Sequence, residues 1–370
     1  MKKILICTGN LAGGGAEKVL VNLLKKVDYT KYKITLVLVW KHGVYLDKIN
    51  ENVEIKYIWP NDKDVLKNIR VMKILPQYFY NKYLDGDYDL EISFLEGITT
   101  NLMSYSKNPK SIKLAWVHTN IKTYHWTKNE FIFKFLEKKS YSKFDKIVCV
   151  SKDSKEAFID MYGFEEKVEV IHNSIDLEEI EVKAKEKIDI DEEYCLTIGR
   201  LIPEKGYERL INQFFKYKEI DNKLKLVIIG DGWMKEQLNN LIIERKMEEN
   251  IIMIPFNENP YKYIKNCKFF ICSSIIEGYS LVVAEALCLN KAIITTDCKG
   301  VRSVIDDGKY GIIVENSDEG IYKGLLDINR NKLIIEEYER KITDTVKENF
   351  TIEKQIQSIY NLVKKIEGKL

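Results

Sequence analysis

Two stretches of the chain share one order: a short apolar run, a glycine-containing loop and a segment with helical spacing. The first stretch begins at Lys3–Cys7 and passes through Gly13–Gly15 into a helix over Val19–Leu24. The second begins at Tyr194–Ile198 and enters the loop Gly199–Gly206. This order opens a doubly wound α/β domain, in which parallel strands alternate with helices and ligands bind at the carboxyl ends of the strands. A chain of 370 residues is long enough for two such domains.

Further apolar runs of strand length follow in both halves of the chain. They are Ile34–Trp40, Val53–Ile58, Leu90–Phe94, Lys113–Val117, Lys146–Val150 and a strand and turn in Val168–Asp176, then Leu226–Gly230, Ile251–Pro255, Cys267–Cys272 and Ala292–Thr296. The charged stretch Glu178–Glu193 has little apolar pattern, and we interpret it as a linker. Asp62–Leu84 is typical of a basic amphipathic helix that Pro76 ends or kinks. The spacing over Thr351–Ile366 predicts a C-terminal helix that packs back on the body.

The charge of the chain is nearly balanced, with 58 Lys and Arg against 56 Asp and Glu, which gives no signature of nucleic-acid binding. Residues 1–170 hold 28 basic and 21 acidic residues, so this half is basic; anionic lipid or a phosphorylated acceptor would fit it, and so would scattered surface lysines. The seven cysteines form no C-x-x-C pair and lie mostly in apolar runs. This pattern is typical of buried free thiols in a protein from a reducing compartment. No segment is long and apolar enough to span a bilayer. We therefore expect a cytoplasmic protein, with the inner face of the membrane as a possible location.

The most informative stretch runs from Ser273 to Leu287. It follows the apolar run Cys267–Cys272 and becomes helical after Gly278, with Ser280 as a candidate cap. Glu277 then lies at a strand-to-helix turn, and the amides of residues 278 to 281 would leave the helix end as an anion site.

A carboxylate beside an anion site repels phosphate, so Glu277 needs another partner, most simply hydroxyl groups. Glu285 lies one to two turns into the helix and could accept further hydroxyls. A phosphate site between two hydroxyl acceptors suggests a nucleotide sugar. The alternative is that Glu277 is an ordinary first-turn carboxylate and Glu285 a solvated helix residue.

Two further places at strand ends carry candidate chemistry. Arg200 and Lys205 flank the second strand-to-helix loop, where a guanidinium fork and an ammonium could both reach a diphosphate. His118 follows the strand Lys113–Val117, and an imidazole there could hold or move a proton; a buried, hydrogen-bonded structural histidine is the alternative.

Two other motifs in the chain argue against competing activities. The glycines at 13 to 15 do not fit G-x-G-x-x-G, and no Lys-Ser/Thr follows them, so a dinucleotide site and a P-loop are poorly supported. Asp85-Gly86-Asp87 imitates a D-x-D metal motif, but it precedes a strand and is interpreted as a turn. We expect neither a metal nor another cofactor.

The motifs in this order resemble a glycosyltransferase of the GT-B fold, family 4, the retaining group. The resemblance rests on Gly13-Gly14-Gly15-Ala16-Glu17, on Val170–Asp176, on Gly199-Arg200-Leu201 with Lys205-Gly206, and on the E-x7-E pair Glu277 and Glu285. It implies two Rossmann-like doubly wound parallel-sheet domains that face each other across a cleft. Residues 1–175, with a helix over about 350–370, would bind the acceptor, and residues 176–349 would bind the nucleotide-sugar donor.

The resemblance also assigns roles to residues. Arg200 and Lys205 would bind the diphosphate in place of a metal, and Glu285 would accept the ribose hydroxyls. Glu277 would orient the donor sugar with the amides of Gly278, Tyr279, Ser280 and Leu281. Gly14 and Gly15 would face the diphosphate from the first domain, and His118 would lie near the sugar and the acceptor. Three positions depart from the family pattern: Ser174, Ser303 and Pro255.

The sequence therefore predicts a retaining glycosyltransferase that moves a sugar, from UDP-hexose or UDP-N-acetylhexosamine, to a hydroxyl of a glycan. A polyprenyl-diphosphate-linked acceptor in capsule, exopolysaccharide or O-antigen assembly fits the basic first half. The alternatives are a nucleotide-sugar epimerase of the same fold, an NAD-dependent dehydrogenase, and a sugar-binding protein without catalysis.

Overall fold

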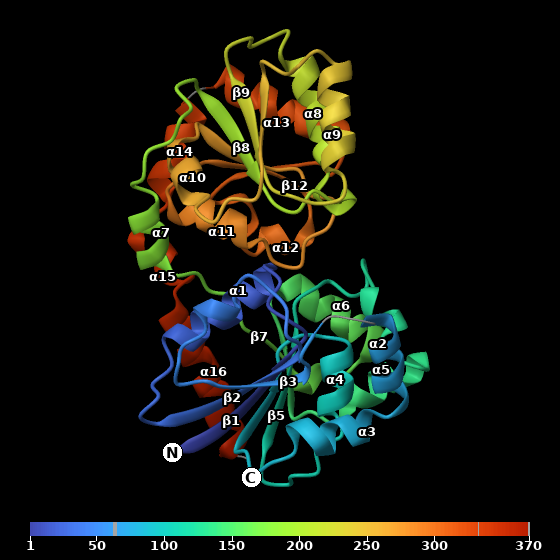
Figure 1. The fold of residues 1–370 in the computed structure, drawn as a ribbon. Helices are drawn as coiled ribbons and strands as arrows, with labels where there is room; N and C mark the ends of the chain where they lie inside the picture. The colour runs from blue at the N-terminus through green and yellow to red at the C-terminus, as the bar shows by residue number, and fades with distance from the viewer. Residues whose placement is uncertain (62–64, 332, 369–370) are drawn as a thin grey trace. The chain divides into compact units, whose positions relative to one another are not determined.

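The computed structural model describes residues 1–61, 65–331 and 333–368, so the first three residues of the predicted helix Asp62–Leu84 lie outside it. The chain divides into two compact units, one formed by Met1–Ser174 with Ile352–Leu370 and the other by Ile175–Thr351. Each unit contains one sheet of parallel strands with helices on both faces (Figure 1). The predicted class, two doubly wound α/β domains, is therefore confirmed.

The sheet of the first unit has the order β3-β2-β1-β4-β5-β6-β7. Its strands are β1 (Lys2–Thr8), β2 (Tyr32–Trp40), β3 (Glu54–Trp59), β4 (Leu90–Ser93), β5 (Ile112–Val117), β6 (Lys146–Cys149) and β7 (Val168–Val170). Its helices are α1 (Gly15–Lys25), α2 (Val65–Ile74), α3 (Pro76–Phe79), α4 (Ile98–Met103), α5 (Lys134–Ser142), α6 (Lys152–Tyr162) and α16 (Ile352–Glu367). Helices α1 and α16 lie on one face of the sheet, and α2, α4 and α5 lie on the other (Figure 1).

The sheet of the second unit has the order β10-β9-β8-β11-β12-β13. Its strands are β8 (Tyr194–Ile198), β9 (Lys225–Ile229), β10 (Ile251–Ile254), β11 (Phe269–Cys272), β12 (Ile293–Thr296) and β13 (Ile312–Val314). Its helices are α7 (Leu177–Lys183), α8 (Tyr207–Tyr217), α9 (Lys235–Glu244), α10 (Tyr261–Asn266), α11 (Leu281–Cys288), α12 (Lys299–Arg302), α13 (Asp318–Arg330), α14 (Leu333–Lys341) and α15 (Asp344–Glu348). The strand order changes direction at β8 and β11, so the loops after these two strands lie where doubly wound folds bind ligands.

The C-terminal helix α16 packs on the first unit, as the sequence predicts. It contacts α1 and buries Ile352, Leu362 and Ile366, which recur along one helix face. Ser174 stands where the family usually has glycine, and its hydroxyl donates a hydrogen bond of 2.6 Å to Oε1 of Gln355 on α16. This serine therefore ties the end of the first α/β segment to the returning tail.

The stretch Glu178–Glu193, which we interpret as a linker, contains most of a helix. Residues 177–183 form helix α7, because Asp176 caps its first turn by accepting a hydrogen bond from the amide of Glu179 (3.1 Å). Ile180 is buried and anchors the helix, while Lys183 pairs with Glu179 one turn away. The side chain of Asn259 also donates to the carbonyl of Lys183, so contacts from outside the segment help to hold a helix that shows little apolar periodicity.

The basic segment before Leu84 also differs in detail from one amphipathic helix. Helix α2 ends at Ile74, and Pro76 occupies the first turn of α3. A π-helical turn over Tyr80–Leu84 follows. Proline is tolerated in a first turn because its missing N–H would be unpaired there in any case, so Pro76 divides the segment as predicted.

All seven cysteines are free and buried, which agrees with their positions in apolar runs. Within the described part of the chain, no helix is both long and apolar enough to cross a membrane.

Candidate active site

Lys205 and Glu277 meet between the loops that follow β8 and β11. Lys205 Nζ lies 2.5 Å from Glu277 Oε1, and the two side chains are 19% and 10% exposed. The hydroxyl of Ser274 donates to the same carboxylate oxygen at 2.8 Å. The structure thus joins a cation and a carboxylate 72 residues apart in the chain at one sheet edge.

The electrostatics of this pair keep Lys205 charged. Burial by itself lowers the pKa of the Lys205 ammonium, but the Glu277 carboxylate outweighs it, so the pKa lies above its usual value. The nearby Arg200 guanidinium lowers that pKa slightly. Arg200 itself is exposed at the carboxyl end of β8. A fixed ammonium and an exposed guanidinium together suit a diphosphate.

The loop that carries Glu277 is held by side chains from two other elements. The Arg209 guanidinium on α8 donates to the carbonyl of Ser273 at 3.0 and 2.6 Å and to that of Ser274 at 2.9 Å. It also donates to Asn316 Oδ1 at 2.7 Å. Asn316 Nδ2 in turn donates to the carbonyl of Ile275 at 3.0 Å. The loop preceding Glu277 is therefore fixed by hydrogen bonds to its backbone.

Helix α11 begins at Leu281, so only the last of the four amides predicted as an anion site, those of residues 278 to 281, lies in the helix. Ser280 occupies the N-cap position, but its buried hydroxyl makes no capping hydrogen bond and has no partner among the described residues. The first helical amide is that of Leu281, so the amides of Gly278 and Tyr279 belong to the preceding loop rather than to the helix end. The side chains of Tyr279 and Leu281 are buried, so only their backbone groups could reach a ligand.

Glu285 lies inside α11 and is 2% exposed. The Tyr261 hydroxyl is 3.5 Å from its Oε1. The alternative that Glu285 is a solvated helix residue is therefore wrong. Carboxylates are almost never fully buried unless they are paired, and the Tyr261 hydroxyl is one partner of this one.

In the first unit, the predicted glycine loop connects β1 to α1. Gly13 has φ +113°, a backbone conformation that favours glycine. Gly14 is the N-cap of α1, and Gly15 is its first, exposed residue. A Cβ on Gly14 would lie 2.2 Å from Oε2 of Glu17, so the Glu17 side chain folds back over the start of the helix. This glycine loop follows the carboxyl end of β1, which lies between β2 and β4 inside its sheet.

His118 follows β5 and is held in one tautomer. Its Nε2 lies 2.9 Å from the carbonyl oxygen of Phe94, which can only accept, so Nε2 carries the proton. Nδ1 is then an acceptor; it is buried and has no partner among the described residues. The backbone amide of His118 donates to Glu96 Oε2 at 2.9 Å. The ring thus presents one unused acceptor, which suits a hydroxyl donor better than a phosphate.

Comparisons with known proteins match most of the chain. Residues 178–348 match the family described as Glycosyl transferases group 1, and residues 13–179 match Glycosyltransferase Family 4. An N-acetylgalactosamine-N,N'-diacetylbacillosaminyl-diphospho-undecaprenol 4-alpha-N-acetylgalactosaminyltransferase of Campylobacter jejuni is 30% identical over 92% of this chain and 94% of its own. The chain belongs to glycosyltransferase family 4.

Solved structures confirm the GT-B fold of this glycosyltransferase. HepE of Anabaena, in complex with UDP and glucose, has a TM-score of 0.78 at 16% identity and covers 98% of this chain and 100% of its own. Sucrose-phosphate synthase of Thermosynechococcus elongatus has a TM-score of 0.79 at 12% identity and covers both chains completely. At such identities the likeness shows the fold alone.

Two departures of this glycosyltransferase from the family pattern lie in the second unit. Ser303 is the C-cap of α12, directly after Arg302, which forms two hydrogen bonds of 2.7 Å to Asp297. Pro255 is exposed and immediately follows β10. Neither departure replaces Lys205, Glu277 or Glu285, so the charged groups of the predicted site are all present.

Sequence reasoning missed two groups of residues that shape the glycosyltransferase site. Arg209 and Asn316 fix the loop of Glu277, as described above. Glu96, which follows β4, is buried and accepts hydrogen bonds from the His118 amide, the Thr119 hydroxyl (2.7 Å) and the Trp126 indole (3.3 Å). The one available signal for Glu96 was its place at a strand end.

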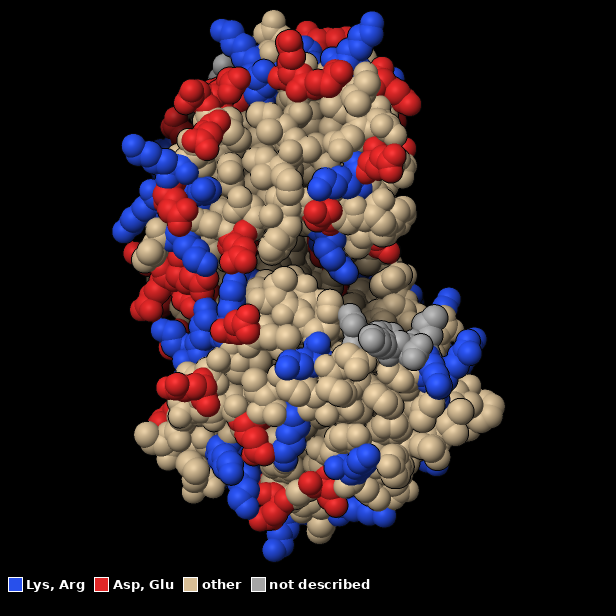
Figure 2. Space-filling view, in the orientation of Figure 1, with Lys and Arg blue, Asp and Glu red and all other residues tan. Residues whose placement is uncertain are grey.

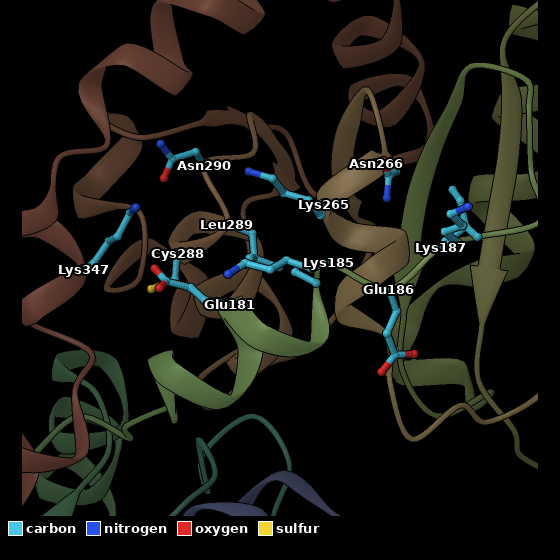
Figure 3. A pocket seen from close by; sticks show the side chains of 12 residues that line it. Glu181, Lys185, Glu186, Lys187, Lys265, Asn266, Cys288, Leu289, Asn290 and Lys347 are labelled. Carbon is cyan, nitrogen blue, oxygen red and sulfur yellow. The ribbon is translucent and has the colours of Figure 1, made fainter.

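A hollow of about 700 Å³ lies elsewhere in the second unit, between α7, α10 and the C-terminal end of α11 (Figure 3). Lys185, Lys187, Lys265 and Lys347 contribute to its lining. None of the predicted site residues lines it, so it is separate from the predicted donor site.

The burial of His118 leads to a testable pH dependence of stability. Burial, partly offset by the Glu96 charge, lowers the pKa of His118 below its ordinary value of 6.5. The unfolded chain then binds more protons than the folded chain as the pH falls below about 6.5. The free energy of unfolding should therefore decrease as the pH is lowered from about 6.5, by up to about 1.4 kcal/mol for each unit by which folding lowers the His118 pKa.

The matched variant is His118→Gln, which keeps a side-chain N–H for the Phe94 carbonyl but does not titrate. Denaturant unfolding from pH 7.5 to 5 should show a smaller loss of stability for this variant than for the wild type. Equal pH slopes would show that the His118 pKa is not lowered.

Proposed function

We propose that this glycosyltransferase is a retaining enzyme that takes a hexose or N-acetylhexosamine from a UDP-linked donor. The observation that carries the proposal is the Lys205–Glu277 pair beside the start of α11, with the buried Glu285 in the same helix. Lys205 and Arg200 would bind the diphosphate and stabilise the leaving UDP as its charge develops. Glu285 would accept ribose hydroxyls, and Glu277 would accept a sugar hydroxyl.

The Campylobacter jejuni relative supports the acceptor and the stereochemistry that we propose. Its name describes an alpha-linked product on a diphospho-undecaprenol-linked saccharide. UDP-hexoses carry their sugar in α linkage, so an α product means retention. The acceptor of this chain would likewise be a hydroxyl of a glycan on a polyprenyl diphosphate, at the cytoplasmic face of a membrane, in the assembly of a surface polysaccharide.

In the proposed reaction, the bond between the anomeric carbon and the β-phosphate oxygen breaks, and its electron pair goes to that oxygen. The acceptor hydroxyl forms the new bond on the same face of the sugar, and its proton passes to the departing phosphate. The neutral His118 would accept a hydrogen bond through Nδ1 and position a hydroxyl. No step in this scheme needs a metal, because Arg200 and Lys205 supply the positive charge.

A donor screen that measures nucleotide release tests the proposal, with membrane extract supplied as the acceptor. We expect release from a UDP-sugar that depends on the acceptor and changes less than twofold when EDTA is added. Conversion of the donor sugar without an acceptor would identify an epimerase instead. A rise in the melting temperature with NADH but not with UDP would favour a dehydrogenase, and UDP-sugar binding without turnover would favour a sugar-binding protein.

A further inference from the structure

The first unit exposes large apolar side chains on two adjoining segments. Phe133 and Phe135, at the start of α5, are 59% and 65% exposed. Their rings stack at 5.7 Å with 10° between their planes, so they form one projecting apolar surface. Ile74, at the end of α2, is 65% exposed. The side-chain amine of Lys73 donates a hydrogen bond to the carbonyl of Asn129, which links the end of α2 to the segment before α5.

These side chains are exposed although the segment that carries them is itself well packed. Neighbouring Phe131 is 5% exposed, and Glu137 on α5 is buried, so α5 is anchored on both sides of the two phenylalanines. Leu75 and Tyr78 are exposed in the same way after the end of α2. Contiguous apolar surface on a folded protein usually marks a site of interaction. We name the apolar side chains of these two segments the aromatic ridge: Ile74, Leu75, Tyr78, Ile132, Phe133 and Phe135.

Most of the charged residues around the aromatic ridge are basic, and the half-buried Glu130, which interacts with Lys73, is an exception. Residues 65–84 contain four basic residues and no acidic residue. On α5, Lys134, Lys138 and Lys139 are exposed, whereas Glu137 is buried and bonded to His125 at 2.8 Å. Figure 2 shows Lys and Arg side chains beside uncharged surface on the flank that carries α2 and α5 in Figure 1. The accessible charge of α5 that adjoins the ridge is therefore positive.

We propose that the aromatic ridge docks on a bilayer with anionic headgroups. Exposed aromatic rings partition into the boundary between headgroups and acyl chains, and lysines beside them extend along this boundary to the lipid phosphates. Anionic lipid also attracts each basic residue near its surface, so the apolar ridge and the neighbouring lysines both favour binding to the same membrane. This interaction is independent of donor chemistry, and it would place the first unit at the surface on which a lipid-linked acceptor lies.

Flotation with vesicles of phosphatidylcholine containing 30% phosphatidylglycerol tests the proposal, with pure phosphatidylcholine as the reference. We expect the full chain to float with the anionic vesicles, at least tenfold more strongly than with the neutral ones, and to dissociate in high salt. The double variant Phe133→Ser/Phe135→Ser should lose at least tenfold in vesicle binding. The double variant Lys134→Glu/Lys138→Glu should lose binding to anionic vesicles specifically.

Matched controls come from the second unit. Ile220 and Ile243 are exposed there, and so are Lys216 and Lys223. The variants Ile220→Ser/Ile243→Ser and Lys216→Glu/Lys223→Glu should bind vesicles like the wild type. Because the changed side chains are exposed, all four variants should melt within a few degrees of the wild type.

Three outcomes would overturn the proposal. The first is no binding by the wild type, and the second is equal binding by the ridge variants and their controls. The third is a change of oligomeric state, measured by light scattering, that accompanies Phe133→Ser/Phe135→Ser without any effect on vesicles. This result would assign the ridge to a contact between two copies of the chain.

Discussion

Replacing Lys205 by methionine is expected to lower the turnover number by about 10²- to 10³-fold, the effect of removing one preorganised electrostatic donor. Methionine keeps most of the volume but no charge, so the developing charge on the leaving diphosphate loses its ammonium. The affinity for UDP should fall as well. Steady-state kinetics of nucleotide release and calorimetric titration of UDP measure the two effects.

Stability must be separated from catalysis in this variant. Glu277 is only 10% exposed, and an unpaired carboxylate there would lower the free energy of unfolding by about 3 kcal/mol. The double variant Lys205→Met/Glu277→Gln should recover much of this stability without recovering turnover. Lys146, which is 11% exposed and 3.0 Å from Glu169 in the first unit, provides the matched control. Lys146→Met should reduce stability but leave turnover within a few-fold of the wild type. If the turnover of Lys205→Met were also unchanged, the assignment of Lys205 to the diphosphate would be wrong.

The second large effect is expected from Glu277→Gln. Glutamine keeps an oxygen for the Ser274 hydroxyl but removes the charge that holds Lys205. Turnover should fall by about 10²-fold, because the acceptor for a donor-sugar hydroxyl becomes weaker while the charge balance of the site changes. UDP should bind as well as before or more tightly, because a negative charge beside the diphosphate has gone. Both variants should therefore lose turnover, but only Lys205→Met should lose affinity for UDP.

The control for Glu277→Gln is Glu208→Gln, which removes the same charge from an exposed position on α8 of the same unit. It should change neither turnover nor UDP affinity by more than twofold. If both glutamate variants weakened UDP binding equally, Glu277 would have no specific place in the donor site.

The parallel strands were predictable because of their burial. A strand covered by helices on both faces is a continuous apolar run, and β8 (Tyr194–Ile198) lies at the residues that its sequence indicates. Strand β13, of which only one residue is buried, was missed. Helix α7 was missed because its Asp176 cap and its contacts from outside the segment add no periodicity.

The sequence by itself determined the two α/β units, the strand-end positions of Arg200 and Glu277, and the family. Buried strands appear as apolar runs, and the loop residues that follow them can be recognised from their order in the chain. The tertiary structure alone decided which groups meet. Arg209 reaches Asn316 over 107 residues, and Lys205 reaches Glu277 over 72. The fixed tautomer of His118 depends on the carbonyl of Phe94, 24 residues away, which directly follows another strand. Such pairings depend on the order and register of strands in a sheet, which no local pattern contains.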